Sequence, residues 1–389
     1  MIYTGKGGTG KTVNSCSTAI RLADLGKKTL IISADPAHTL NDAFMVNIIG
    51  NDTKKILNNL YAIQVDPVIE LDKNFNSILS YNASLFFSNG LDEIIAYEMS
   101  MLPGMTQLFS LMKIQESAHH DDYEVIVLDM PASGEALRYL YLPKLVGSIG
   151  RKLTKYTGIF SGFAKMFESF PGFRSNAPYN VINDEIQLIT KLEDLSKLII
   201  DPTITSLRLV ANPDTFSIEN AKRSLMSANL YGINVDLVLV NKIMPNSNDM
   251  YFSNWSIFQN NKVKDAKNNF YPLPIKEIML YEKELRGIDM LRKNALSIFG
   301  DDDPSKIFYS ERVFEFVKED PLLKLKLKVP FTIGDDFYLD RSSENLIIKV
   351  KGSVGYIVNV IPLPSMTIGM KIIRSELINN ELQIFFEKK

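Results

Sequence analysis

The residues best able to do chemistry form a glycine-rich segment close to the start of the chain: Gly5, Lys6, Gly7, Gly8, Thr9, Gly10, Lys11 and Thr12. They fit the pattern G-x-x-x-x-G-K-[ST], with a short strand before it and a helix after it. The backbone N–H groups of such a loop point inward and bind phosphate, and the helix N-terminus adds a partial positive charge. The pattern predicts that Lys11 bridges the β- and γ-phosphates of a nucleotide and that Thr12 binds Mg²⁺.

Two acidic residues follow apolar runs that are typical of buried parallel strands. Asp35 ends the run that starts at Thr29, and Asp129 ends the run that starts at Val125. Ligands bind at the carboxyl ends of such strands, so both carboxylates are predicted to lie beside the phosphate loop and to contribute to a Mg²⁺ site. The simpler interpretations are an N-cap for Asp35 and an ordinary strand end for Asp129.

The elements that must position these residues alternate as a doubly wound α/β sheet requires. Further strands are predicted at 207–211 and 236–241, and a helix from Lys11 to about Leu25, with Gly26 as its stop. The fold class is therefore α/β, with a mostly parallel sheet. Two stretches, 72–117 and 144–198, lack strand signals, and we expect them to form a helical subdomain.

The hydrophobic pattern changes from helix-like to strand-like near residue 321. A last helix is predicted from about Ser305 to Lys318, and from there to Lys389 short alternating runs and Gly or Pro punctuation indicate strands. The prediction is an α/β domain over 1–320 and a small all-β sandwich over 321–389.

Bulk composition restricts the partners. The chain has 389 residues, 46% of them hydrophobic, and its formal net charge of −2 gives no reason to expect nucleic acid or an anionic membrane as the main partner. Cys16 is the only cysteine, which excludes an internal disulfide and a cysteine-rich zinc site and favours a reducing cytoplasm. Neither a signal peptide nor an apolar run of ~18 residues is present, so no integral membrane segment is expected.

Lys6 points to a particular group of ATPases, because an ordinary phosphate loop does not need a lysine there. The loop resembles the deviant loop of the MinD, nitrogenase-iron-protein and ArsA group, which implies a homodimer in which Lys6 reaches the ATP of the partner. A solvated loop lysine is the alternative. The segment 35–44, DPAHTLNDAF, resembles the first switch of the ArsA and tail-anchored-protein-targeting ATPases. That resemblance implies that Asp35 orients or deprotonates the attacking water. The loop itself implies that Lys11, and Lys6 acting across the dimer, assist catalysis.

Weaker similarities extend to about residue 300. The stretch 130–138 resembles the second switch, although Met130 and Glu135 depart from its pattern. Asn241 resembles the family's adenine-recognising asparagine, since an amide both donates and accepts hydrogen bonds, but it is also a common turn residue. The resemblance further implies that Pro272 and Leu273 lie beside the base, and the segment 284–287 resembles the E-x-x-G that follows.

Features outside the nucleotide site leave the function open. Cys16 alone cannot form a trigonal sulfur site for arsenite, and no C-x-x-C pair is present for a bridging zinc. A stripe of Phe and Met within 159–170 fits either a groove for hydrophobic clients or ordinary packing. The C-terminal domain resembles the α-crystallin-like appendage of some ArsA homologues, which would either bind unfolded segments or pack beside the ATPase core.

These observations favour a homodimeric, Mg²⁺-dependent ATPase whose nucleotide state controls the binding of a hydrophobic protein client or of a membrane protein partner. The alternative is the catalytic ATPase subunit of an arsenite or anion efflux pump. A positioning ATPase of the MinD or ParA type is disfavoured, because no terminal amphipathic helix or basic patch is visible.

Overall fold

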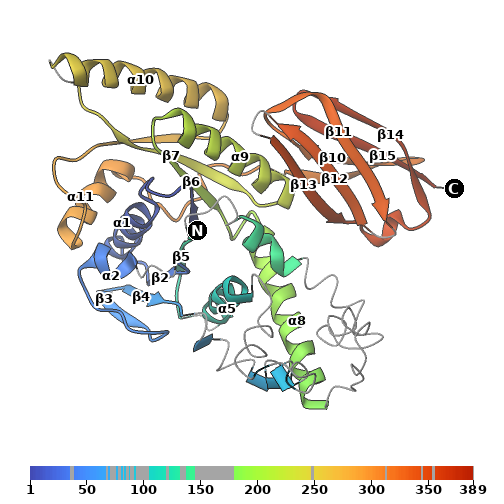
Figure 1. The fold of residues 1–389 in the computed structure, drawn as a ribbon, viewed down its shortest axis with the longest axis horizontal. Helices are drawn as coiled ribbons and strands as arrows, with labels where there is room; N and C mark the ends of the chain where they lie inside the picture. The colour runs from blue at the N-terminus through green and yellow to red at the C-terminus, as the bar shows by residue number, and fades with distance from the viewer. Residues whose placement is uncertain are drawn as a thin grey trace.

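The chain folds into an α/β body with a separate β lobe at its C-terminal end (Figure 1). The structure is a computed structural model, and it describes residues 1–35, 39–66, 69–70, 76–77, 80–81, 83–84, 87, 92, 105–119, 122–131, 137–144, 179–246, 249–311, 313–342, 345–352 and 355–388. Among these residues, no helix combines the length and the apolar character needed to cross a bilayer.

The body is built on an eight-stranded sheet with the order β3-β4-β2-β5-β1-β6-β7-β8. Seven strands run parallel and only β3 is antiparallel to its neighbour, which confirms the predicted doubly wound class. The strand bounds are β1 Ile2–Thr4, β2 Thr29–Ser33, β3 Lys54–Leu57, β4 Leu60–Gln64, β5 Val125–Asp129, β6 Leu207–Ala211, β7 Val235–Ile243 and β8 Ile275–Met279.

Helices cover both faces of this sheet because successive strand side chains point to opposite sides. Ile31 belongs to the buried cluster that contains α1 (Lys11–Asp24), α2 (Thr39–Phe44) and α11 (Ile288–Phe299). Its neighbours Leu30 and Ile32 belong to the cluster on the opposite face. The described helices on that face are α5 Met105–His119, α8 Tyr179–Ile200, α9 Thr215–Tyr231 and α10 Met250–Phe270.

The first helix follows its prediction closely. It begins at Lys11, directly after the phosphate loop, and ends at Asp24. Gly26 then takes a φ of 86°, a left-handed conformation that glycine adopts without strain, and the next N–H closes the helix on the carbonyl of Leu22. Within the two stretches predicted to be helical, α5 and α8 are helices, and the helical subdomain as a unit stays a prediction.

The C-terminal lobe consists of two antiparallel sheets, β14-β15-β10-β9 and β11-β12-β13. Alternate side chains point into one core, as Leu323 and Leu325 do from one sheet and Ile348 and Val350 from the other. The bounds are β9 Phe314–Glu319, β10 Leu322–Lys328, β11 Thr332–Ser342, β12 Asn345–Gly352, β13 Gly355–Pro362, β14 Met370–Ile378 and β15 Glu381–Lys388, with a short 3-10 helix at Ser365–Thr367.

The helix predicted from Ser305 to Lys318 is wrong. Residues 314–319 form β9, which pairs with β10 so that Phe316 lies opposite Leu325. The pairing partner lies further along the chain, and it overrides the weak local preference of a charged segment. The all-β lobe therefore includes residues that precede the boundary predicted at 321.

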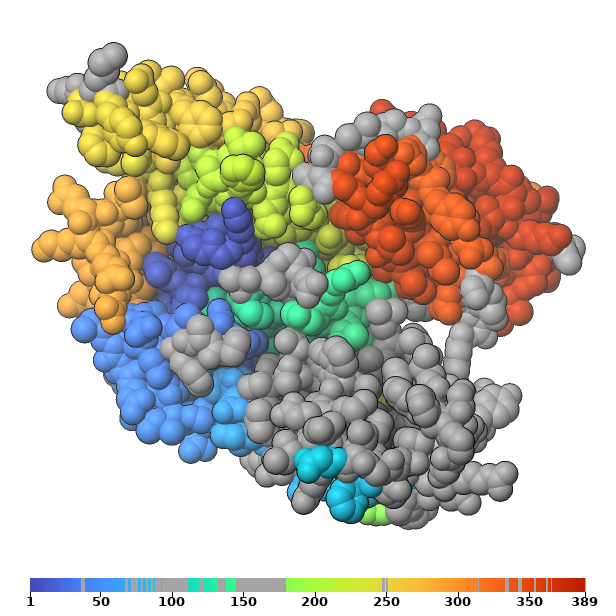
Figure 2. All heavy atoms as spheres, viewed as in Figure 1, coloured from blue at the N-terminus to red at the C-terminus, as the bar shows by residue number. Residues whose placement is uncertain are grey.

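The lobe is attached to the body through the second half of α9 and the segment around Tyr141. The side chain of Asn359 on β13 donates a buried hydrogen bond to the carbonyl of Leu230, and the Tyr141 hydroxyl donates to the carbonyl of Val360. Both bonds join the same strand of the lobe to different parts of the body. Figure 2 shows the two parts in contact, with the lobe as a distinct red and orange mass.

Candidate active site

The phosphate loop lies at the carboxyl end of β1, in the middle of the sheet. Replacing its first or last glycine by any other residue would force neighbouring atoms of the protein to move. A Cβ on Gly5 would lie 2.2 Å from the carbonyl oxygen of Val210, and a Cβ on Gly10 would lie 2.3 Å from Nδ2 of Asn241. The Thr9 hydroxyl donates a 2.8 Å hydrogen bond to the carbonyl of Lys6, which closes the loop on itself. The loop is thus shaped by its own sequence and by β6 and β7.

Two consecutive residues near the end of β7 donate hydrogen bonds to backbone carbonyls of the phosphate loop. Asn241 Nδ2 donates to the carbonyl of Thr9 at 2.8 Å, and Lys242 Nζ donates to the carbonyl of Gly8 at 2.8 Å. The Asn241 Oδ1 accepts from the backbone N–H of Lys242. In this structure the amide of Asn241 therefore orients the phosphate loop, and its predicted contact with adenine stays a prediction. Lys242 was not singled out in the sequence.

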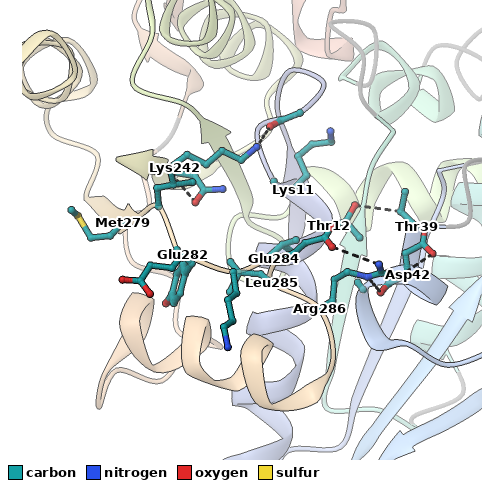
Figure 3. Close-up of a pocket in the computed structure, with 18 of the residues that line it drawn as sticks. Lys11, Thr12, Thr39, Asp42, Lys242, Met279, Glu282, Glu284, Leu285 and Arg286 are labelled. Atoms are coloured by element: carbon teal, nitrogen blue, oxygen red, sulfur yellow. Dashed lines mark hydrogen bonds and ion pairs between the residues drawn. The ribbon is translucent and has the colours of Figure 1, made fainter. Parts of the chain in front are cut away.

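A cavity of about 730 Å³ opens beside the loop (Figure 3). Three predicted residues, Lys11, Thr12 and Asp35, line one part of it, and Asn241 lines another. The rest of the wall comes from other residues of the loop and of α1, from Lys242, from Thr39, Asp42 and Ala43 of α2, and from the segment 279–286 that begins at the end of β8. The motif at 284–287 therefore lies next to the predicted nucleotide site.

Pro272 and Leu273 are not part of this wall, so their predicted contact with the base is wrong. They precede β8, which begins at Ile275, and they line a different cavity of about 450 Å³ beside the C-terminal lobe. The reason is the direction of the strand. In a parallel sheet, residues before a strand lie at its amino end, whereas the phosphate loop lies at the carboxyl end.

Thr12 and Asp129 form the centre of the predicted metal site. The Thr12 hydroxyl donates to Asp129 Oδ2 at 2.7 Å and lies 3.3 Å from the Thr39 hydroxyl. Asp129 is fully buried, and its Oδ1 has no hydrogen-bond partner among the described residues. A buried carboxylate oxygen without a partner, beside two hydroxyls, suits a hard cation that takes oxygen ligands. These residues therefore fit Mg²⁺.

Burial also controls the charges at this centre. Desolvation raises the pKa of Asp129 to about 7, although the hydrogen bond from Thr12 and the charge of Lys11 act in the opposite direction. Desolvation lowers the pKa of Lys11, opposed by the charges of Asp129 and Asp35. Burial therefore disfavours the charged form of both groups, and their opposite charges only partly offset it; a bound metal and phosphate would supply further compensation.

Asp35 lies at the end of the segment that follows β2 and lines the cavity. Its backbone is fixed on both sides, because its N–H donates to the Ser33 hydroxyl at 3.2 Å and its carbonyl accepts from Gln64 Nε2 at 2.8 Å. Gln64, a fully buried residue on β4, was missed in the sequence because nothing marks it beyond its place in an apolar run. Residues 36–38 of the first switch, and 132–136 of the second, lie outside the described residues.

Lys6 does not line the cavity of its own chain. Its side chain is exposed, and Nζ lies 5.4 Å from the centroid of the Phe216 ring, within the range of a cation–π contact. The structure therefore separates the two lysines of the loop, since Lys11 faces the cavity and Lys6 faces a neighbouring surface.

The segment after β8 is joined to α2. The backbone N–H of Gly287 donates to the carbonyl of Ala43 at 2.8 Å, and Arg286 Nε donates to the carbonyl of Asp42 at 3.3 Å. Figure 3 shows Arg286 between Glu284 and Asp42, with which it forms ion pairs. Helix α2, which forms the second half of the first switch, and the far wall of the cavity are thus connected directly.

Cys16 is fully buried in α1, and burial raises the pKa of its thiol well above the ordinary value. This placement confirms the expected packing role. The Phe and Met stripe predicted within 159–170 lies outside the described residues.

A nucleotide-sized cavity bounded by this loop, at the carboxyl edge of a parallel sheet, defines a P-loop nucleotide-binding protein. Residues 1–299 match the family described as anion-transporting ATPases. The chain belongs to this family and is an ATPase.

Relatives extend the similarity over most of the chain. A protein of Chlorobaculum tepidum named as an arsenical pump-driving ATPase is 34% identical over 370 residues, covering 91% of this chain and 90% of the relative. One of Aquifex aeolicus with a similar name is 28% identical over 401 residues, covering 99% of each. A protein of Pyrenophora tritici-repentis named ATPase get3 is 30% identical over 254 residues, covering 62% of this chain and 72% of the relative.

Proposed function

We propose that this ATPase works in the cytoplasm as a Mg²⁺-dependent homodimer that couples its nucleotide state to the binding of a hydrophobic client, in protein targeting or as a chaperone. The observation that carries the proposal is the separation of the two loop lysines. Lys11 faces the cavity of its own chain, whereas Lys6 is exposed and outside it. A second copy that approaches this surface would receive Lys6 at its own nucleotide.

Different residues of the chain would carry out different parts of ATP hydrolysis. Lys11 would bind the β- and γ-phosphates, while Thr12 and Asp129 would hold Mg²⁺, which neutralises charge on the phosphate oxygens when it is bound. Asp35 would orient the attacking water or accept its proton. Lys6 of the second copy would stabilise the charge that develops in the transition state.

A response to the nucleotide would pass through α2. This helix follows the segment that contains Asp35, and its carbonyls at Asp42 and Ala43 accept hydrogen bonds from the far wall of the cavity. Closure around ATP would therefore move both walls together and reshape the surface that meets the client.

The second candidate is the catalytic ATPase subunit of an arsenite or anion efflux pump, which the names of two relatives favour. The thiol chemistry weighs against arsenite. Cys16 is the only cysteine in the chain, it is fully buried, and arsenite prefers several soft thiolate ligands.

The two candidates can be separated by one comparison. ATPase rate and molecular mass in solution are measured with arsenite, with a hydrophobic helical peptide, with a polar peptide of the same length, and with none of them. The proposal expects stimulation or tighter dimerisation with the hydrophobic peptide only. Stimulation by arsenite alone would establish the pump subunit instead.

A further inference from the structure

A second cavity lies between the body and the C-terminal lobe. Its volume is about 450 Å³, within the range of about 300–1,000 Å³ that is typical of small-molecule sites. The body contributes the end of α9, the start of β7 and the connection from α10 to β8, and the lobe contributes the turn between β14 and β15. In Figure 1, α9 lies next to the lobe. Strand β7 begins at this cavity and ends beside the phosphate loop, so the two cavities lie at opposite ends of the sheet's strands.

Asn229 on α9 is a buried amide that lines this cavity. The residue is only 7% exposed, and its side chain makes no hydrogen bond with any described residue. Buried amides are nearly always paired, because a polar group that loses water without gaining a partner is destabilising. Asn294 on α11 shows the usual arrangement, since its Nδ2 donates to Asn14 Oδ1 at 3.1 Å and to Ser17 Oγ at 3.0 Å. An unpaired amide at the wall of a cavity is therefore a candidate for contact with a ligand.

The charges of the wall disfavour an anionic ligand. Among the described residues that line the cavity, Glu311 and Glu381 are acidic and Lys328 is basic. Lys328 forms an ion pair with Glu311, which also accepts a hydrogen bond from the Tyr309 hydroxyl. Phosphate or a carboxylate would therefore meet a net negative wall, whereas a hydroxyl group can donate to a carboxylate.

The rest of the wall combines apolar surface with further polar groups. Leu225 and Phe270 are buried, whereas Tyr271 is 83% exposed, which places its ring at the opening of the cavity. Gln383 donates to Glu381 Oε1 at 2.7 Å through its amide nitrogen, so its own carbonyl oxygen can still accept. A ring that carries hydroxyl groups suits this wall. Its edge donates and accepts hydrogen bonds, and its C–H face packs on apolar and aromatic side chains.

We infer that this cavity binds a neutral ligand with several hydroxyl groups on a ring, as in a mono- or disaccharide or in the ribose of a nucleoside. Asn229 would both donate to and accept from one hydroxyl, and Glu381 would accept from another. Tyr271 would cover the apolar face of the ring at the opening. Because the body and the lobe both line the cavity, a bound ligand would hold the two parts together and stabilise the folded chain. The inference depends neither on the proposed homodimer nor on the proposed client.

Binding is tested on the full chain with ADP and Mg²⁺ at saturation, so that the nucleotide cavity is already filled. Saturation-transfer NMR and thermal unfolding are measured with glucose, galactose, mannose, maltose, lactose, trehalose and uridine, each at millimolar concentration. The inference expects a transfer signal and a higher melting temperature with at least one of them. Dideoxyuridine, which lacks the ribose hydroxyls, and inorganic phosphate are the negative controls.

The outcomes distinguish the sources of the ring. A signal from a saccharide identifies a free sugar as the ligand, and a signal from uridine that dideoxyuridine does not give identifies a ribose. Equal signals from uridine and dideoxyuridine with none from a saccharide would overturn the inference, because recognition would then not depend on hydroxyl groups. The absence of any signal would overturn it as well.

A substitution separates a binding role of Asn229 from a structural one. Asn229→Leu keeps the size of the side chain and removes its donor and acceptor, so affinity for the bound ligand should fall by about ten-fold or more. The melting temperature of the free chain should stay the same or rise, because no hydrogen bond is lost. Asn294→Leu is the matched control. It should lower the melting temperature through the lost bonds to Asn14 and Ser17 and leave ligand affinity unchanged.

Tyr271→Ala provides a second variant at an exposed position, where folding is not at risk. It should also weaken binding, because it removes the ring at the opening. Circular dichroism checks the fold of each variant. Unchanged affinity in a folded N229L chain or in Y271A would contradict the inference, and so would an equal loss of affinity in N294L.

Discussion

The hydroxyl of Thr12 donates a 2.7 Å hydrogen bond to Asp129 Oδ2, joining two residues that lie 117 positions apart in the chain. We expect Asp129→Asn to lower kcat by on the order of 10²-fold or more, because it removes a charge that stabilises the site during phosphoryl transfer. Thr12→Ala should have a similar effect. Steady-state ATPase assays across a range of Mg²⁺ concentrations measure both. Thr332→Ala, which removes a comparable hydroxyl contact in the C-terminal lobe, is the control.

Asp129 also makes the metal-free protein sensitive to pH. Burial raises its pKa to about 7 in the folded chain, above the ordinary value of 3.8 that applies when the chain is unfolded. The folded state therefore binds this proton more tightly, and the contribution to stability is present below pH 4 and is lost as pH rises toward 7. With a chelator at pH 8, Asp129→Asn should raise the melting temperature, while the difference from the wild type disappears near pH 4. A difference that stays constant over this range would contradict the assignment.

Gly10 and Asn241 can be tested as a pair. Gly10→Ala places a methyl group 2.3 Å from Asn241 Nδ2 at a φ of 91°, so nucleotide affinity should fall sharply. Asn241→Ala makes room but leaves the carbonyl of Thr9 without its donor. We expect the double variant to bind nucleotide better than Gly10→Ala alone, and a calorimetric double-mutant cycle measures the coupling. Purely additive losses would show that the two residues do not act on each other.

Arg208 and Asp236 form an ion pair in which both side chains are fully buried. Arg208 also donates hydrogen bonds to the Tyr3 hydroxyl and to the carbonyl of Pro304. The second bond connects the segment after α11 to the sheet. Arg208→Met should lower the free energy of unfolding by about 3–5 kcal/mol, because Asp236 is left buried without its partner. Urea unfolding measures the loss, and a second change, Asp236→Leu, should restore part of it.

An exposed pair serves as the comparison. Lys197 and Asp194 lie on the surface of α8, with side chains 73% and 39% exposed. Lys197→Met should change the free energy of unfolding by less than ~1 kcal/mol. An equal effect of the two substitutions would mean that burial does not set the strength of these pairs.

Loss of Lys6 should lower the rate of hydrolysis, whereas loss of Lys242 should weaken ATP binding. Lys6→Ala is expected to leave ATP affinity nearly unchanged and to lower kcat, because Lys6 lies outside its own cavity. Lys242→Ala should weaken ATP binding by a few-fold, since it frees the carbonyl of Gly8. Mixing a Lys6→Ala chain with an Asp35→Asn chain tests action between subunits, because only a mixed dimer holds one site with both residues intact. No recovery of activity in the mixture would argue against a lysine that acts across the dimer.

The sequence was sufficient for the sheet and for the loop, because both depend on local patterns. The buried runs that end at Asp35 and Asp129 alternate between two covered faces. Gly5 and Gly10 of the loop occupy positions where a side chain would collide with the backbone of β6 or with Asn241. The strand of the C-terminal lobe at 314–319 was missed because its partner, β10, follows it only after a turn and outweighs its local preference.

The site was predicted less completely than the fold. The similarity of motif placed Pro272 and Leu273 beside the base. These residues precede β8, which starts at Ile275, so they lie at the amino edge of the sheet and the phosphate loop lies at the carboxyl edge. Lys242 and Arg286 act through contacts with backbone carbonyls, which no residue pattern records. Arg208 lies in an otherwise apolar strand, and its partners come from three distant segments.

The burial of Cys16 has a practical consequence. Its thiol has no access to solvent and is held in the protonated form, so thiol reagents should leave the folded chain unmodified. The wild-type protein is therefore a ready background for site-specific labels. A cysteine introduced on α2 and another on the segment after β8 would carry a pair of spectroscopic probes without removing any native residue, and the distance between them would follow the two walls of the cavity through a cycle of ATP hydrolysis.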